Sequence, residues 1–211
     1  MKKERPTVYP IDDDASVREG VTDLLRSVGH VVQAYGSAQE FLDDEQPDAP
    51  GCIVLDVRLP GPSGLEIQRM LTELNVHLPV IFISGHADIP MSVRAIKSGA
   101  IEFLAKPLHE QQLLDAVQAG IEHDRTQRAK AKEIAELQKR FASLTPCERD
   151  VLTLVVSGQR NKQIAGQLKL SEMTVKVHRS HIMQKMGANS LVHLVRMADE
   201  LGVSIRSHQA T

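Results

Sequence analysis

The chain has 211 residues, of which 42% are hydrophobic, so it can build one large or two small globular domains and is not disordered in bulk. Its net charge of −2 hides a division, because residues 1–124 hold 20 acidic and 10 basic side chains whereas residues 125–211 hold 7 and 15. No apolar run is long enough to cross a membrane and no apolar segment follows the basic N-terminus, so we expect a cytoplasmic protein with no membrane partner.

The acidic part alternates short β-rich runs with helical patterns. Helices are expected after the N-caps Ser16, Ser37 and Ser63, and from Pro90 onward. This alternation predicts a parallel sheet of five strands with helices on both faces. The β-rich runs cover residues 7–11, 31–35, 52–55, 80–84 and 101–105.

Polar side chains stand where the expected strands end. Asp12 and Asp13 follow the first strand, Asp56 closes the third, Ser84 closes the fourth and Lys106 follows the fifth. Because the carboxyl ends of parallel strands meet at one edge of a sheet, we expect these side chains to gather there. An aspartate after a strand can also serve only as a helix cap, but the full set in register favours a functional site.

Residues 6–122 resemble the receiver domain of a two-component response regulator, through the segments IDDD, VLDVRLPGPSG and ISGHADIPMSVRAIKSGAIEFLAKP. The resemblance implies a flavodoxin-like, CheY-like α/β fold. It also implies that Asp12, Asp13, Asp56 and the backbone carbonyl of Arg58 bind Mg²⁺, a cation that prefers oxygen ligands. Asp56 would then accept a phosphoryl group from the phosphohistidine of a cognate histidine kinase.

The same resemblance gives three further residues a part in the response to phosphorylation. Lys106 would offset the charge of the phosphoryl group, and Ser84 would donate a hydrogen bond to it. Phe103 would turn inward into the space that Ser84 vacates. Taken alone, a phenylalanine in this position is more often a core residue than a switch.

Three residues near the expected site have separate interpretations. Pro10 departs from the expected pattern, because proline in a central strand removes a hydrogen bond and predicts local distortion or weak pairing. Asp14 is expected to act as a helix cap or turn residue. His86 is expected to be a loop residue beside the site.

The segment between the two parts of the chain is expected to be one long helix. Between residues 110 and 141 the only helix-breaking residue is Gly120, and the middle is rich in helix-forming residues, where a flexible linker would carry Gly, Ser or Pro. A two-stranded coiled coil is the weaker alternative, since the apolar seam is broken.

The basic part predicts a four-helix unit. A helix begins at Pro146, a short one follows an N-cap at Asn161, a longer one follows Ser171, and the last follows Ser190. The two middle helices are joined by a short turn, which is typical of a helix-turn-helix whose second helix enters the major groove of DNA.

Residues 144–203 resemble the LuxR-type helix-turn-helix domain, through the segments LTPCERDVLTLVVSG, NKQIAGQL and SEMTVKVHRSHIMQKM. With the receiver, the chain is similar to response regulators of the FixJ/NarL type. We therefore expect a receiver over residues 1–122, a helical linker over 123–142 and a DNA-binding domain over 143–211.

Helical spacing on the third helix of this unit separates its core from its surface. Lys176 and Val177 are the expected base contacts, because an ammonium suits guanine acceptors and an aliphatic side chain suits a thymine methyl. Arg179 and Lys162 are expected to meet phosphates, and Thr174 completes the expected DNA-binding set. Residues expected to face inward are Val175, His178, Ile182 and Met186, and those expected to face outward include Met173 and Ser180. His178 and His181 have the spacing of zinc ligands but lack a third partner, so zinc is the weaker interpretation.

Together these patterns predict a transcription regulator that is not an enzyme beyond transferring a phosphoryl group to its own Asp56. Phosphorylation is expected to promote a homodimer that binds paired half-sites of double-stranded DNA, with RNA polymerase as a further partner. One alternative is a regulator that binds DNA without phosphorylation and uses the receiver as an interaction module. A phosphatase with an aspartate nucleophile is disfavoured, because the residue two positions after Asp56 is Arg58 and not a second aspartate.

Overall fold

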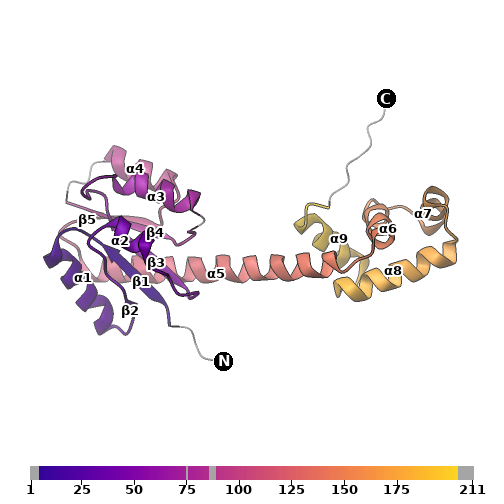
Figure 1. Ribbon diagram of the computed structural model, residues 1–211, viewed down its shortest axis with the longest axis horizontal. Coiled ribbons are helices and arrows are strands. Elements are labelled where there is room, and N and C mark those ends of the chain that lie inside the picture. Colours follow the sequence, from indigo (N-terminus) through magenta and orange to yellow (C-terminus); the bar gives the residue numbers. More distant parts are fainter. Residues whose placement is uncertain (1–4, 75, 86–88, 204–211) are drawn as a thin grey trace. The chain divides into compact units, whose positions relative to one another are not determined.

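The computed structural model describes residues 5–74, 76–85 and 89–203, and His86 lies outside them. The chain forms two compact units that divide between Arg128 and Ala129. Helix α5, Glu110–Ala142, runs from the first unit into the second, so the expected long helix is confirmed (Figure 1). No described helix is both long enough and apolar enough to cross a membrane.

The first unit contains the predicted sheet of five parallel strands, in the order β2-β1-β3-β4-β5. The second β-rich run is shorter than expected, because only two of its residues form a strand. The strands are β1 Thr7–Ile11, β2 Val31–Val32, β3 Gly51–Asp56, β4 Val80–Ser84 and β5 Glu102–Ala105. The helices between them are α1 Ala15–Ser27, α2 Ala38–Asp43, α3 Gly64–Glu73 and α4 Ile89–Lys97.

Two apolar layers hold the sheet between its helices. On β3, Cys52 and Val54 belong to the layer shared with α1 and α5, whereas Ile53 and Leu55 belong to the layer shared with α2, α3 and α4 (Figure 1). All four side chains are fully buried. Burial of each of the three aliphatic ones, Ile53, Val54 and Leu55, contributes about 1.5–3 kcal/mol to the stability of the fold. Burial on both faces explains why the strand reads as a continuous apolar run.

Most of the predicted helix caps are confirmed. The side chains of Ser37, Ser63, Ser171 and Ser190 each accept a hydrogen bond from a backbone N–H in the first turn of the following helix. The prediction for Ser16 is wrong, because α1 begins earlier and the side chain of Asp14 accepts from the N–H groups of Ser16 and Val17. The expected capping role of Asp14 is thereby confirmed.

Pro10 does not distort the pairing of β1 with β3, although a proline in a central strand predicts local distortion or weak pairing. The register between β1 and β3 is continuous along β1. The carbonyl of Pro10 accepts from Tyr35 N at 2.9 Å and that of Val8 accepts from Gln33 N at 3.1 Å, so these residues direct their backbone polar groups toward the β2 side. The missing N–H of Pro10 therefore faces the short edge strand, which ends at that point.

The middle of α5 is fixed to the sheet by a buried carboxylate. Asp124 is 3% exposed, and it accepts hydrogen bonds from Gly51 N at 2.9 Å and from Arg128 Nε at 2.8 Å. Arg128 also pairs with Asp48 at 2.5 Å. Because Gly51 opens β3, this contact ties the helix to the strand that ends at Asp56.

The second unit consists of the end of α5 and four further helices. Leu137 of α5 packs in a core formed with the buried residues Val151, Ile164, Val175 and Ile182. The predicted four-helix unit is therefore confirmed, and the end of the long helix packs into its core. The helices are α6 Pro146–Val156, α7 Asn161–Leu168, α8 Glu172–Met186 and α9 Leu191–Glu200.

Replacing Asp124 by Asn should lower the free energy of unfolding by about 1.5–3 kcal/mol, because the change removes a charge-assisted hydrogen bond at a buried site. Urea unfolding of the full chain, followed by circular dichroism, measures the loss. Asp48→Asn is the matched control, since its side chain is 99% exposed and its ion pair with the same arginine should contribute no more than about 1 kcal/mol. Equal losses in the two variants would contradict the assignment of Asp124 as the anchor.

Candidate functional sites

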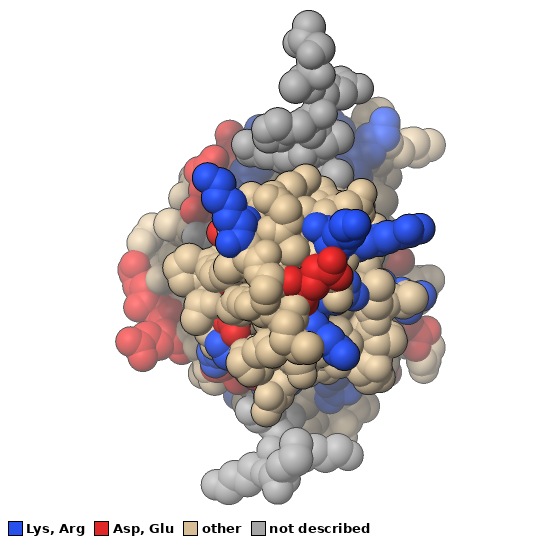
Figure 2. All heavy atoms as spheres, turned by 90° about the vertical axis from the view of Figure 1, so that its right-hand side faces the viewer, with Lys and Arg blue, Asp and Glu red and all other residues tan. Residues whose placement is uncertain are grey.

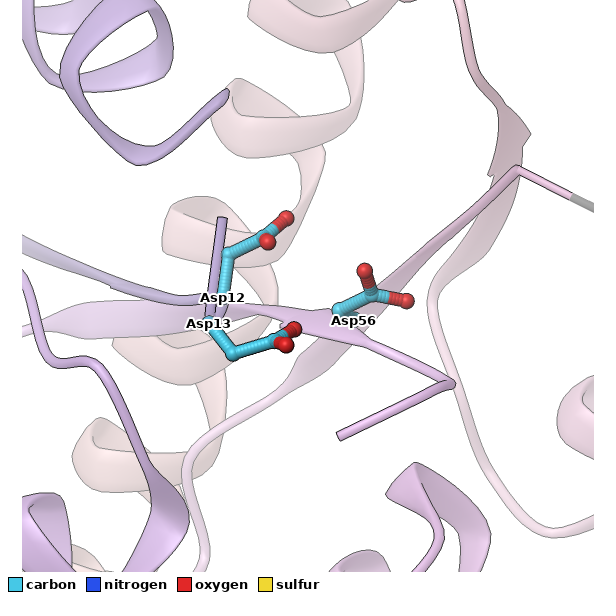
Figure 3. Close-up of side chains that lie close together, drawn as sticks. All are labelled: Asp12, Asp13 and Asp56. Carbon is cyan, nitrogen blue, oxygen red and sulfur yellow. The ribbon is translucent and has the colours of Figure 1, made fainter. Parts of the chain in front are cut away.

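Three carboxylates gather at the carboxyl edge of the sheet (Figure 3). Asp12 and Asp13 follow β1, and Asp56 ends the neighbouring strand β3. One oxygen from each residue lies within 4.8 Å of the others. Asp12 and Asp56 are 1% and 6% exposed, whereas Asp13 is open to solvent. Hard oxygen ligands that converge from a buried and an exposed side fit Mg²⁺, which keeps part of its water shell.

Lys106, directly after β5, brings a positive charge to these carboxylates. Its Nζ lies 2.7 Å from Asp12 Oδ2 and 2.5 Å from Asp56 Oδ2. Burial disfavours the ammonium, but the hydrogen bonds to Asp12 and Asp56 outweigh it, so the pKa of Lys106 is raised. Burial also raises the pKa of Asp12, and the hydrogen bond from Lys106 opposes that rise only in part. The lysine is thus held as a cation between two carboxylates.

Backbone groups fix the two buried carboxylates from the other side. Arg58 N donates to Asp56 Oδ1 at 2.9 Å, and Asp14 N donates to Asp12 Oδ1 at 2.9 Å. The guanidinium of Arg18 donates to the carbonyl of Asp12 at 2.5 Å. No local pattern in the sequence indicates this contact, because Arg18 is one charged residue among several in the first turns of α1.

Gly64 is a second residue of the site that the strand-end pattern does not predict. A Cβ atom there would lie 2.7 Å from the carbonyl oxygen of Asp56 and 2.9 Å from Cα of Val57. Only glycine lets α3 begin this close to the end of β3. The glycine directly after the cap Ser63 was the available signal for such a close approach.

The two expected switch residues lie on neighbouring strands. Ser84 ends β4 and is fully buried, and its carbonyl accepts from Lys106 N at 2.8 Å. Phe103 lies on β5, partly buried, with its ring centroid 6.4 Å from that of Phe82. Phe103 therefore packs against the core, as is expected when this phenylalanine is considered alone.

In the second unit, α7 and α8 form the expected helix-turn-helix. Lys169 makes the turn in a left-handed conformation, with φ of 55°. The inward positions of α8 are largely as expected, since Val175, Ile182 and Met186 are buried, while His178 is half-buried.

The outward face of α8 also agrees with the helical spacing. Met173 and Val177 are 69% and 46% exposed, and Lys176 and Ser180 are exposed beside them. Figure 2 shows one face of this unit, where separate Lys and Arg side chains surround a largely uncharged surface with acidic side chains among them. On the face that Figure 2 shows, the positive charge is thus spread out and is not gathered into one patch.

The remaining expected DNA contacts differ in how free they are. Lys162, in the first turn of α7, is exposed. Arg179 is half-buried and donates to Asn161 Oδ1 at 2.9 Å, so it links α8 to α7. Asn161 is not the N-cap that was predicted, because α7 begins at Asn161 itself and Arg160 precedes it. Thr174 belongs to the capping turn of α8, where its N–H donates to Ser171 Oγ at 3.0 Å.

The first turn of α6 is fastened to α8 by a polar contact, hereafter the α6–α8 contact. Glu148 is 3% exposed, with Lys185 Nζ at 2.6 Å and His181 Nδ1 at 3.7 Å. Burial opposes ionisation of Glu148, but the hydrogen bonds from Lys185 and Thr145 prevail and lower its pKa to about 2. Cys147 completes the contact, with Sγ 3.5 Å from His178 Nε2.

This contact does not form the zinc site that the histidine spacing allowed as a weaker interpretation. Across the described ranges, the one cluster of three metal-ligating side chains is that of Asp12, Asp13 and Asp56.

Comparison with protein families matches both units. Residues 8–118 match the response regulator receiver domain, and residues 142–198 match the bacterial regulatory proteins of the luxR family. The matches agree with the carboxylate site of the first unit and with the helix-turn-helix of the second.

Individual relatives match along nearly the whole chain. The chain is 50% identical to nodulation protein W of Bradyrhizobium diazoefficiens over 204 residues, which cover 97% of this chain and 90% of that protein. It is 44% identical to the transcriptional regulatory protein FixJ of Azorhizobium caulinodans over 197 residues, or 93% of each. Among solved structures it is similar to the response regulator StyR, with a TM-score of 0.81 and 48% identity over 93% of this chain and 99% of that one.

Both domains match in one chain, and the relatives match along nearly its whole length. These two findings assign the chain to a family. The chain belongs to the response regulators that join a receiver domain to a LuxR-type DNA-binding domain, and it is a phosphorylation-controlled regulator of transcription.

Proposed function

We propose that Asp56 is the phosphoryl acceptor of this regulator, with Mg²⁺ bound by Asp12, Asp13, Asp56 and the backbone carbonyl of Arg58. The observation that carries the proposal is the position of Asp56, which ends β3 within reach of two further carboxylates and of the Lys106 ammonium. When bound, the cation would neutralise negative charge at the carboxylates and at the incoming group. The domain limits predicted from the sequence, residues 1–122, 123–142 and 143–211, are proposed with it.

The chemistry asked of the chain is positioning and charge balance. A carboxylate oxygen of Asp56 attacks the phosphorus of a phosphohistidine, an O–P bond forms, the P–N bond breaks, and the electron pair leaves with the imidazole of the kinase. Arg58 N already holds one Asp56 oxygen and Lys106 the other. Both contacts orient the carboxylate, and Lys106 is placed to offset the charge that the phosphoryl group brings.

Ser84 and Phe103 are proposed to change position when Asp56 is phosphorylated. Ser84 ends β4 next to β3, so its hydroxyl lies at the same edge of the sheet as Asp56. Phe103 is partly buried on the edge strand β5, and its ring packs against the layer shared with α2, α3 and α4, into which it would turn. Movement of the serine toward the phosphoryl group and of the ring inward would alter the surface formed by α4 and β5.

For the DNA-binding unit we propose that Lys176 and Val177 contact base edges, while Lys162 and Thr174 contact the DNA backbone. Their positions on α7 and α8 support this, because the two base-reading side chains share the exposed face of α8. Arg179 is proposed to meet phosphate from the position that its bond with Asn161 fixes.

A homodimer of the phosphorylated form is proposed to use α4 and β5. The helix exposes an apolar stripe whose members, Ile89, Val93 and Ile96, are 79%, 45% and 46% exposed. Spacings of four and three residues place the stripe on one face of the helix. A second copy that covers this stripe would bring two DNA-binding units to paired half-sites, where contact with RNA polymerase is expected.

Incubation with Mg²⁺ and a small-molecule phosphodonor should add one phosphoryl group per chain, measured by intact mass. Asp56→Asn should abolish the adduct because it removes the nucleophilic oxygen, whereas Asp14→Asn should retain it, since Asp14 only caps α1. A chain that binds its DNA equally well with and without the adduct would support the alternative in which the receiver is an interaction module. An undiminished adduct on Asp56→Asn would refute the assigned acceptor.

Lys176→Ala should weaken binding to a specific DNA site by about 1–3 kcal/mol, because it removes a contact to a base edge. Titrations of labelled DNA should show a much smaller loss on random sequence. Lys132→Ala, on the exposed side of α5, is the control for the loss of one positive charge. Equal losses on specific and random DNA would show that Lys176 meets phosphate and not a base.

Val93→Glu should keep the phosphorylated chain monomeric in sedimentation velocity, because a charge in the apolar stripe cannot be buried in a dimer without a partner. Leu74→Glu is the matched control at another surface position, 58% exposed, and should dimerise like the unaltered chain. A dimer of normal stability in Val93→Glu would locate the interface elsewhere.

A further inference from the structure

The two cysteines of the chain have opposite environments. Cys52, on β3, is fully buried, with its Sγ 3.8 Å from the carbonyl of Val117, and burial raises the pKa of its thiol to about 12. Cys147 is half-buried at the second position of α6. Since the thiolate is the reactive form, Cys52 is chemically protected whereas Cys147 is accessible to small reagents.

A proton acceptor lies against Cys147. His178 Nε2 lies 3.5 Å from Sγ, so the imidazole can accept the thiol proton. The thiol also lies at the positive end of α6, and the negative charge of the neighbouring Glu148 is balanced by Lys185 at 2.6 Å.

Cys147 also holds a position from which a chemical change would reach the DNA-binding helix. Cys147 touches His178 through the α6–α8 contact. His178 directly follows Val177, which lies on the exposed face of α8. At 3.5 Å the sulfur and the ring nitrogen are in contact, so an oxygen added on the side of the sulfur that faces the ring would displace one of them. His178 is half-buried on α8 and contacts α6 through Cys147, so its displacement would alter the packing of α8 against α6.

We propose that Cys147 is a redox-modification site, at which oxidation by a hydroperoxide weakens DNA binding. His178 accepts the thiol proton, the sulfur attacks one peroxide oxygen, an S–O bond forms and the O–O bond breaks. The leaving hydroxide takes the proton from His178. When the oxidant is hydrogen peroxide, the products are therefore sulfenic acid and water. Because Cys52 is buried, a small external thiol must restore the residue, with two thiols giving one disulfide, one water and the reduced cysteine.

The thiol chemistry is tested first, without DNA, on the reduced full-length chain. Alkylation by iodoacetamide, mapped by peptide mass, should modify Cys147 and spare Cys52. His178→Gln should slow alkylation of Cys147 on the order of tenfold, because an amide cannot accept the proton. An unchanged rate in that variant, or equal labelling of the two cysteines, would overturn the proposed site.

The effect on DNA binding is then tested with hydrogen peroxide. One oxygen added at residue 147 should lower affinity for specific DNA on the order of tenfold, and dithiothreitol should restore it. Cys147→Ser should bind DNA like the reduced chain and should not respond to peroxide. Undiminished affinity in chain shown by mass to be oxidised would overturn the proposed control of DNA binding. Failure of the reduced chain to bind DNA would instead count against the DNA contacts proposed above.

Discussion

The ammonium of Lys106, placed between Asp12 and Asp56, is the interaction on which the first unit depends. Three carboxylates packed at one edge of a sheet repel one another, and two of them are almost without solvent. The lysine lowers that repulsion, and its own burial is offset by the same pair of hydrogen bonds. A phosphoryl group at the proposed acceptor would change the charge that Lys106 must balance, so the pairing would respond to the chemical state of Asp56.

Charge pairing of the same kind recurs in the second unit. Glu148 is buried at the start of α6 and is held by a lysine of α8, much as the acidic site is held by Lys106. In one unit the pair lies at a proposed reaction site, and in the other it fixes the helix proposed to read DNA. Each pair joins elements distant in sequence, and loss of the lysine would leave a buried carboxylate uncompensated in either unit.

The sequence predicted most of the fold and the site because the relevant signals are local. Apolar runs identify β3 and β4, and Ser63 is followed three residues later by the glutamate of a capping box. Aspartates at strand ends can be placed together once the sheet is parallel. The contact of Arg18 with the Asp12 carbonyl and the burial of Glu148 are not local, since each depends on how a side chain is oriented by the folded chain.

The errors at the helix starts have the same origin. Ser16 and Asp14 are both good capping residues two positions apart, and Asp14 caps α1 because β1 ends just before it. Asn161 was predicted to cap its helix, but its side-chain oxygen accepts from Arg179 on another helix. A competing partner from outside the segment decides such cases.

The directions of the backbone N–H and C=O groups of β1 show which of its positions can hold a proline. Thr7 N donates to Pro50 O on the β3 side, whereas Val8 and Pro10 direct their polar groups to the β2 side. An imino acid is therefore accommodated at position 10, because its nitrogen faces the side of β1 on which β2 has already ended at Val32. At Tyr9 or Ile11 the same ring would interrupt the central ladder beneath the acidic cluster.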